Sequence, residues 1–152
     1  MAEFSKAAKG HRANRLLAAM QPDDYARLEP LLEIVDLPRG KILYESGESI
    51  RDAYFPHDAV VSLVAVMEDG DLVEMAVFGR ESLFGLVSAY ISRESLGRFV
   101  VQLPGTASRI RAETFRSIAD ESPTLRELLQ LYVEALLGQT FYTVACNAVH
   151  SV

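Results

Sequence analysis

The sequence is poor in cysteine, in long apolar runs and in basic residues, and each shortage excludes a class of protein. The single cysteine, Cys146, rules out an intramolecular disulfide framework and a multi-cysteine metal cluster. No uncharged apolar run reaches the roughly 18 residues of a membrane-spanning helix. The N-terminus lacks the apolar core and cleavage site of a secretion signal. We therefore expect a cytoplasmic protein that does not enter a membrane.

Lys and Arg number 15 against 21 Asp and Glu, which gives a formal net charge of −6. Because phosphate contacts need clustered cations, we do not expect this chain to bind DNA by itself. The acidic residues form no recognisable acid–base pair and no Ser–His–Asp set stands out, so we expect neither an enzyme nor catalytic residues. His57 follows Pro56 in a predicted turn and is expected at the surface, with no metal site.

What is present fits one domain with a proper core: 152 residues, of which 49% are hydrophobic. Residues 1–13 are small and basic and are predicted to be a flexible arm, and residues 14–152 to be the domain. Asn14 suits the cap of a first short helix, and Pro22 the first turn of a second.

From residue 34 the pattern changes to short runs typical of strands, separated by turn residues. The predicted strands are 34–37, 41–44, 53–55, 60–67, 72–78, 99–103 and 106–110. Residues 60–67 are almost wholly apolar, which indicates a strand buried on both faces, and an Asp-Gly turn joins that strand to the next. Residues 87–91 are apolar, and 111–118 fit a short helix. Such spacing favours a rolled, mainly antiparallel β structure.

The chain is organised around residues 78–86, FGRESLFGL. A glycine after a strand, then a helical turn with a second glycine, leaves backbone N–H groups free to face an anion. A bend between strands, with glycines needed only for positive φ, is the other interpretation.

A long helix is predicted at about 123–150, with Ser122 as its cap and Pro123 at its first position. Its apolar residues form two seven-residue stripes, the spacing of paired helices. An ordinary amphipathic helix packed on its own β-roll is the alternative, and the wide apolar surface suggests both. The residues predicted to face a second copy are Leu125, Leu128, Tyr132, Ala135, Gln139, Tyr142, Cys146 and Val149.

Several segments, in this order, resemble the sensor half of Crp/Fnr-type bacterial transcription regulators. Residues 37–48, LPRGKILYESGE, look like the double turn of cyclic-nucleotide-binding domains, and 54–56 look like the strand that follows. Residues 78–79 with 84–86 are similar to the phosphate cassette of these domains. Phe115 and Pro123 are similar to the residues that lead into the dimer helix of the family. The resemblance implies an α+β, mainly β fold: a double-stranded β-helix (a jelly-roll-like β-roll) with N-terminal helices and a long C-terminal dimerisation helix.

The resemblance also implies the ligand-pocket candidates Gly79, Phe84, Gly85, Leu86, Arg93, Arg98 and Thr140. Nucleotide-binding members place a glutamate where Leu86 stands, and Leu86 cannot accept a ribose hydrogen bond. Arg93 and Arg98 are both candidates for the phosphate-pairing arginine. Thr140 falls where members contact the base, but the bulky Phe141 follows it. We therefore expect a degenerate pocket, empty or holding another small molecule, and no cofactor; a cyclic nucleotide is the less favoured ligand.

The expected function is effector sensing and homodimerisation in a Crp/Fnr-like transcription regulator, with DNA contacted only through a downstream domain that is not in this chain. The chain is then either cut from a longer protein or a stand-alone sensor domain. The alternative function is a stand-alone protein-interaction module with no small-molecule ligand.

Overall fold

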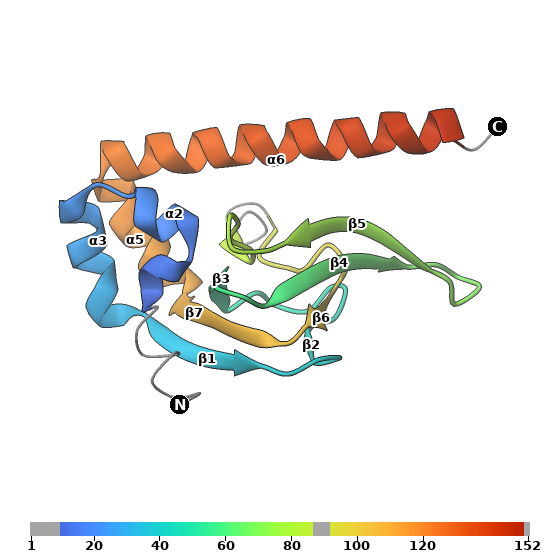
Figure 1. Ribbon diagram of the computed structural model, residues 1–152, viewed down its shortest axis with the longest axis horizontal. Helices are drawn as coiled ribbons and strands as arrows, with labels where there is room; N and C mark the ends of the chain where they lie inside the picture. The colour runs from blue at the N-terminus through green and yellow to red at the C-terminus, as the bar shows by residue number, and fades with distance from the viewer. Residues whose placement is uncertain (1–9, 87–91, 151–152) are drawn as a thin grey trace.

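The computed structural model describes residues 10–86 and 92–150, without the side chains of residues 147 and 150. The chain forms two antiparallel sheets, and helices lie at one end of these sheets (Figure 1). The first sheet has the order β1 (Glu33–Leu37), β7 (Gly105–Arg111), β3 (Asp52–Pro56). The second has the order β2 (Ile42–Tyr44), β6 (Arg98–Leu103), β4 (Val60–Val66), β5 (Leu72–Phe78). This architecture confirms the expected β-roll.

The inner faces of the two sheets share one apolar cluster, which includes Leu37 of β1, Tyr54 of β3, Val61 of β4 and Phe99 of β6. A second cluster joins the outer face of the first sheet to the helices, with Phe55, Phe115 and Leu125 fully buried in it. Successive residues of β3 therefore belong to different clusters, as the alternation of a strand requires. β3 is buried on both faces, as is β7 at Thr106–Ser108, whereas the predicted strand, β4, ends at the exposed Val66.

The helices at the N-terminal end are α2 (Arg15–Ala19) and α3 (Pro22–Leu28), with 3₁₀ turns at His11–Ala13 and Glu29–Leu31. Asn14 caps α2 as predicted, because its Oδ1 accepts hydrogen bonds from the N–H groups of Leu16 and Leu17. Its Nδ2 donates to the carbonyls of Pro56 and Ser82, at 2.9 and 2.8 Å. This buried amide thus fastens the helices to the β-roll.

Two helices follow the sheets: α5 (Ala112–Glu121) and α6 (Pro123–His150). Ser122 caps α6 as predicted, accepting a hydrogen bond from the Leu125 N–H. Figure 1 shows α6 running along the β-roll, and its middle lies beside β5, where Leu136 and Thr140 share a small hollow with residues 74–77. None of the helices in the described part of the chain has the length and apolar character needed to cross a membrane.

The predicted flexible arm ends earlier than residue 13. His11 and Ala13 lie in the 3₁₀ turn, and the His11 Nδ1 is 2.6 Å from the Ser108 Oγ on β7. Residues 1–9, the rest of the arm, and residues 87–91, the predicted apolar run, lie outside the described residues.

Candidate functional site

The loop that follows β5 is bonded both to the N-terminal helices, where the Arg15 N–H donates to the Arg80 carbonyl, and to β3. After Phe78 the chain turns, and the Ser82 N–H donates to the Gly79 carbonyl. The chain then runs beside β3, where Phe84 and Tyr54 exchange two backbone hydrogen bonds of 3.0 and 3.1 Å. Residues 79–86, which we call the cassette loop, therefore lie between the N-terminal helices and the β-roll.

The two glycines of the cassette loop play different parts. Gly85 has φ +94°, and a Cβ atom there would lie 2.4 Å from the Asp52 carbonyl oxygen. Only glycine fits such a backbone and so close a neighbour. Gly79 has neither a positive φ nor any heavy atom near its missing Cβ. The prediction that positive φ explains these glycines thus holds for Gly85 and is wrong for Gly79.

Tyr132 of α6 reaches the cassette loop. Its hydroxyl donates to the Leu83 carbonyl at 2.6 Å and accepts from the Leu83 N–H at 3.2 Å. Burial raises the pKa of Tyr132, and the hydrogen bond to Leu83 opposes that shift only in part. The phenol therefore keeps the proton that it donates to Leu83.

Aromatic rings fill the interior of the β-roll behind the cassette loop. Phe84 stacks on Tyr54 and on Phe99, with ring centroids 5.0 and 5.1 Å away, and Phe78 lies 5.5 Å from it at a tilt. Tyr44 packs edge-on against Tyr54, and burial raises the pKa of Tyr44 to about 12. The rings bury apolar surface and leave little room.

What remains between these rings and α6 is a cavity of about 250 Å³, which we call the inner cavity. Its lining consists of Leu63, Met75, Ala76, Phe78, Leu83, Phe84, Gly85, Leu96, Phe99, Leu136 and Thr140. Thr140 has the one polar side chain among them, and its Oγ1 already donates to the Leu136 carbonyl at 2.8 Å. The inner cavity therefore suits a small apolar molecule better than an anion.

The structure brings only three of the seven pocket candidates to the inner cavity: Phe84, Gly85 and Thr140. Leu86 is buried in the cluster beneath α6 and lines an apolar groove there. The Arg98 side chain forms an ion pair with Glu45 at 3.0 Å. Arg93 lines a different cavity, and Gly79 lines neither of these. Phe141 does not obstruct the inner cavity either, because 68% of its surface is exposed.

His57 is not the surface residue that its turn position predicts, since it is 6% exposed. Its Nδ1 lies 2.9 Å from the Thr106 Oγ1 and its Nε2 2.8 Å from the Ser108 Oγ. Burial is the main reason that the pKa of His57 lies below its ordinary value; nearby His11 lowers that pKa further and Asp58 raises it. The hydrogen-bond partners Thr106 and Ser108 lie on β7, about 50 positions from His57 in the sequence.

Helix α6 divides its predicted dimer residues between two faces. Leu125 is fully buried and Tyr132 partly buried against the chain's own core, so the expectation that a single chain leaves both wet is wrong. Leu128 packs there too. Cys146 is partly buried, and Ala135, Gln139, Tyr142 and Val149 are exposed.

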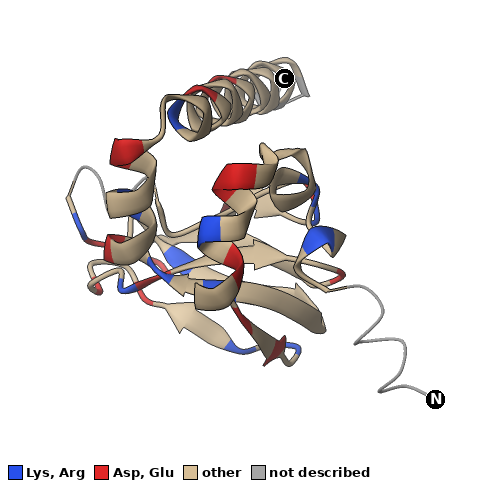
Figure 2. Ribbon diagram, turned by 90° about the vertical axis from the view of Figure 1, so that its left-hand side faces the viewer, with Lys and Arg blue, Asp and Glu red and all other residues tan. Residues whose placement is uncertain are grey.

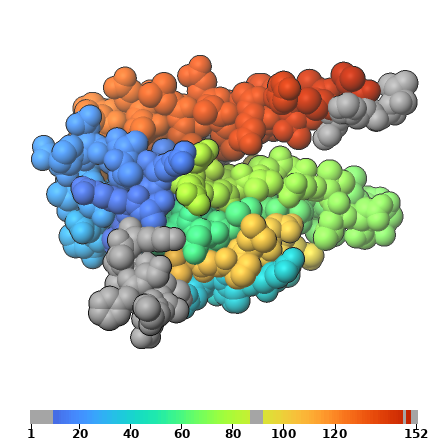
Figure 3. Space-filling model, in the orientation of Figure 1, coloured from blue at the N-terminus to red at the C-terminus, as the bar shows by residue number. Residues whose placement is uncertain are grey.

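The exposed face of α6 carries one continuous line of small and apolar residues, which we call the outer stripe. The outer stripe consists of Leu131, Ala135, Gly138, Tyr142, Ala145 and Val149. Figure 2 shows charged residues only towards the front end of α6, and Figure 3 shows the helix lying along the β-roll with its outer side uncovered.

The cyclic nucleotide-binding domain model matches residues 34–122 of the chain. A comparison with curated protein sequences gave no match. Among solved structures, the N-terminal domain of a transcriptional regulator from Streptomyces coelicolor A3(2) has a TM-score of 0.63 at 22% identity, over 86% of this chain and 93% of that one. The sensor domain of the transcriptional regulator DNR from Pseudomonas aeruginosa has a TM-score of 0.69 at 15% identity, over 91% and 94%.

A third similar structure is the regulatory subunit of a cAMP-independent protein kinase A from Trypanosoma brucei. Its TM-score is 0.67 at 14% identity, over 82% of this chain and 45% of that one. At these identities the structures establish a shared fold, and the resemblance to Crp/Fnr-type sensor domains is confirmed at that level. With the family match spanning more than half of its length, the chain belongs to the cyclic nucleotide-binding domain family.

Proposed function

We propose that this chain is the effector-sensing and dimerisation domain of a Crp/Fnr-like transcription regulator, whose DNA contacts are made by another domain. Its inner cavity is degenerate with respect to cyclic nucleotides. The observation that carries this proposal is the lining of the inner cavity, which joins the cassette loop to α6 and, among the described residues, includes no charged side chain.

The lining argues against a cyclic phosphate as the effector. A phosphate charge moved from water into an apolar site without a partner carries a heavy desolvation penalty. Arg98 is held by Glu45 and Arg93 lies at another cavity, so neither candidate arginine is at hand to offset that penalty. Leu86 offers no acceptor for a ribose hydroxyl. A small apolar effector avoids all three difficulties.

An effector in the inner cavity would touch two parts of the molecule that must move relative to one another. Leu83, Phe84 and Gly85 belong to the cassette loop, and Leu136 and Thr140 to α6. A ligand shifts an equilibrium only through different affinities for two arrangements. Contacts with both parts give it that leverage, and the hydrogen bonds between Tyr132 and Leu83 join the same two parts.

The dimerisation half of the proposal rests on the outer stripe. Its spacing of four and three residues is that of a paired helix, and the small residues Ala135, Gly138 and Ala145 allow a close approach. Tyr142 and Val149 are 73% and 74% exposed in the single chain. Twofold pairing would bury the same face on both copies. Each large apolar side chain would contribute about 1.5–3 kcal/mol before the costs of association.

Light scattering at micromolar concentration tests the proposal. The native chain is expected at twice 16.8 kDa and the Tyr142→Asp variant at 16.8 kDa, since a carboxylate in the stripe cannot be buried unpaired. Gln130→Asp adds the same charge to an exposed position of α6 outside the stripe and should leave the dimer intact. A native chain that already runs as a 16.8 kDa monomer contradicts the proposal.

A further inference from the structure

A second cavity, of about 400 Å³, opens where the segment before β3, the end of β7 and the first turn of α5 meet. Four arginines line it, Arg51, Arg93, Arg111 and Arg116, together with one carboxylate, that of Glu113. The lining thus carries a formal charge of +3 in a chain whose net charge is −6. We call this the arginine cavity.

Other arginines of the molecule are neutralised by neighbours. Arg15, Arg27, Arg98 and Arg109 each form an ion pair with a glutamate, at 2.6–3.0 Å. Arg51, Arg93 and Arg111 have no carboxylate within ion-pair distance among the residues that the structure describes. Like charges gathered without a counter-charge repel one another and attract anions.

Backbone hydrogen bonds fix the positions from which these arginines extend. The Arg93 carbonyl accepts from the Ile50 N–H at 2.9 Å, and the Arg51 carbonyl accepts from the Ala112 N–H at 2.9 Å. Arg111 directly precedes Ala112, which is bonded to Arg51. Arg51 in turn directly follows Ile50, which is bonded to Arg93. Arg93 also holds φ at 61°, a conformation uncommon outside glycine. The charges are gathered by the fold and not by chance side-chain positions.

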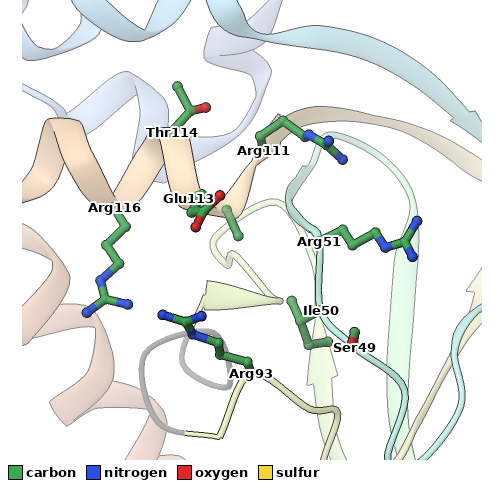
Figure 4. Close-up of a pocket in the computed structure, with 9 residues that line it drawn as sticks. Ser49, Ile50, Arg51, Arg93, Arg111, Glu113, Thr114 and Arg116 are labelled. Atoms are coloured by element: carbon green, nitrogen blue, oxygen red, sulfur yellow. The ribbon is translucent and has the colours of Figure 1, made fainter.

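Figure 4 shows two pairs around the cavity: Arg93 and Arg116 extend towards one another, while Arg51 and Arg111 extend to the other side. The first turn of α5 lies between the pairs, and its Glu113 and Thr114 line the cavity. No side chain caps α5 at Arg111, so the positive end of the helix dipole adds to the arginines.

We propose that the arginine cavity binds a small molecule bearing a pyrophosphate group. A guanidinium group binds phosphate through two parallel N–H donors. Two separate pairs of arginines therefore match two linked phosphates better than they match a single phosphate. The volume is that of a ligand site, whereas a nucleic acid needs a basic stripe over a wide surface. The proposal is separate from the inner cavity and from dimerisation.

Calorimetry with sodium pyrophosphate at low ionic strength tests it, with orthophosphate and ADP as parallel titrants. Pyrophosphate should bind saturably and about tenfold more tightly than orthophosphate. If ADP binds more tightly than pyrophosphate, the site is assigned to a nucleotide. If ADP binds equally or more weakly, the site is assigned to a pyrophosphate compound that needs no nucleoside. Both results support the proposal.

Variants locate the binding. Arg93→Gln and Arg111→Gln should each weaken pyrophosphate binding by about tenfold, whereas Glu113→Gln should tighten it severalfold by removing the one opposing charge. Arg39→Gln removes the same charge from an exposed arginine outside the cavity and should change affinity less than about twofold. No saturable binding by the native chain, or equal weakening by Arg39→Gln, would overturn the proposal. Circular dichroism of each variant confirms that it is folded.

Discussion

The hydroxyl of Tyr132 and the backbone of Leu83 form a pair of hydrogen bonds that closes α6 onto the cassette loop. The two residues are 49 positions apart, and the loop that Leu83 occupies contributes three residues to the inner cavity. Any molecule that displaces Leu83 must therefore lengthen these bonds or move α6. This is the physical link on which the proposed sensing function depends.

Tyr132→Phe removes both hydrogen bonds and leaves the Leu83 N–H and C=O without their partner. The free energy of unfolding should fall by about 1–3 kcal/mol, the cost of unsatisfied buried groups. Urea denaturation measures it. Gln130→Ala, at an exposed position of the same helix outside the outer stripe, is the control and should change stability by less than about 0.5 kcal/mol. Equal effects of the two substitutions would show that the Tyr132 contact contributes nothing.

Gly85→Ala should destabilise the protein by at least about 2 kcal/mol, because a Cβ there meets the Asp52 carbonyl at 2.4 Å on a backbone with φ +94°. Gly79→Ala, six residues earlier in the same loop, should be within about 0.5 kcal/mol of the native chain. Thermal unfolding of both variants distinguishes them. A Gly85→Ala variant as stable as Gly79→Ala would contradict the close approach of loop and strand.

Stability should decrease as the pH falls below His57's ordinary pKa of 6.5. Since burial lowers the pKa of His57 in the folded protein, the unfolded chain takes up the proton first. Its contribution to folding is thus complete above pH 6.5 and is lost as the pH falls towards the folded pKa, by at most about 1.4 kcal/mol per pH unit.

Urea denaturation between pH 7.5 and 5 measures that slope. His57→Gln keeps hydrogen-bonding capacity without the titration, so its stability should depend less steeply on pH. His11 lies in the same network, and burial lowers its pKa as well, so part of the slope should survive in the variant. A slope unchanged by His57→Gln would exclude His57 as its source.

Sequence periodicity predicted most of the fold, because strands and helices follow local patterns. The hairpin strand 72–78 coincides with β5, and the helix predicted at about 123–150 coincides with α6. Asn14 and Ser122 were recognisable as caps from their residue type and position. What local patterns cannot reveal is which of several apolar faces the chain covers itself, and Leu125 and Tyr132 were misassigned for that reason.

The arginine cavity, the burial of His57 and the inner cavity were harder to predict than the fold, because they depend on contacts between segments that are distant in the sequence. Arg51, Arg93 and Arg111 come together only through the pairing of β3 with β7 and the bond between Ile50 and Arg93. His57 becomes buried only because Thr106 and Ser108 meet its ring across the sheet. Of the pocket candidates that the resemblance implies, Phe84, Gly85 and Thr140 line the inner cavity, whereas Leu86, Arg93 and Arg98 do not, and their roles in binding stay predictions.

We expect that the inner cavity does not bind a cyclic nucleotide, although the chain belongs to the cyclic nucleotide-binding domain family. Calorimetry with cyclic AMP and with cyclic GMP tests it most directly. No saturable heat is expected at sub-millimolar nucleotide, because the described residues that line the cavity offer no charged partner for the phosphate. A dissociation constant in the micromolar range for either nucleotide, weakened by a substitution at Thr140, would contradict it.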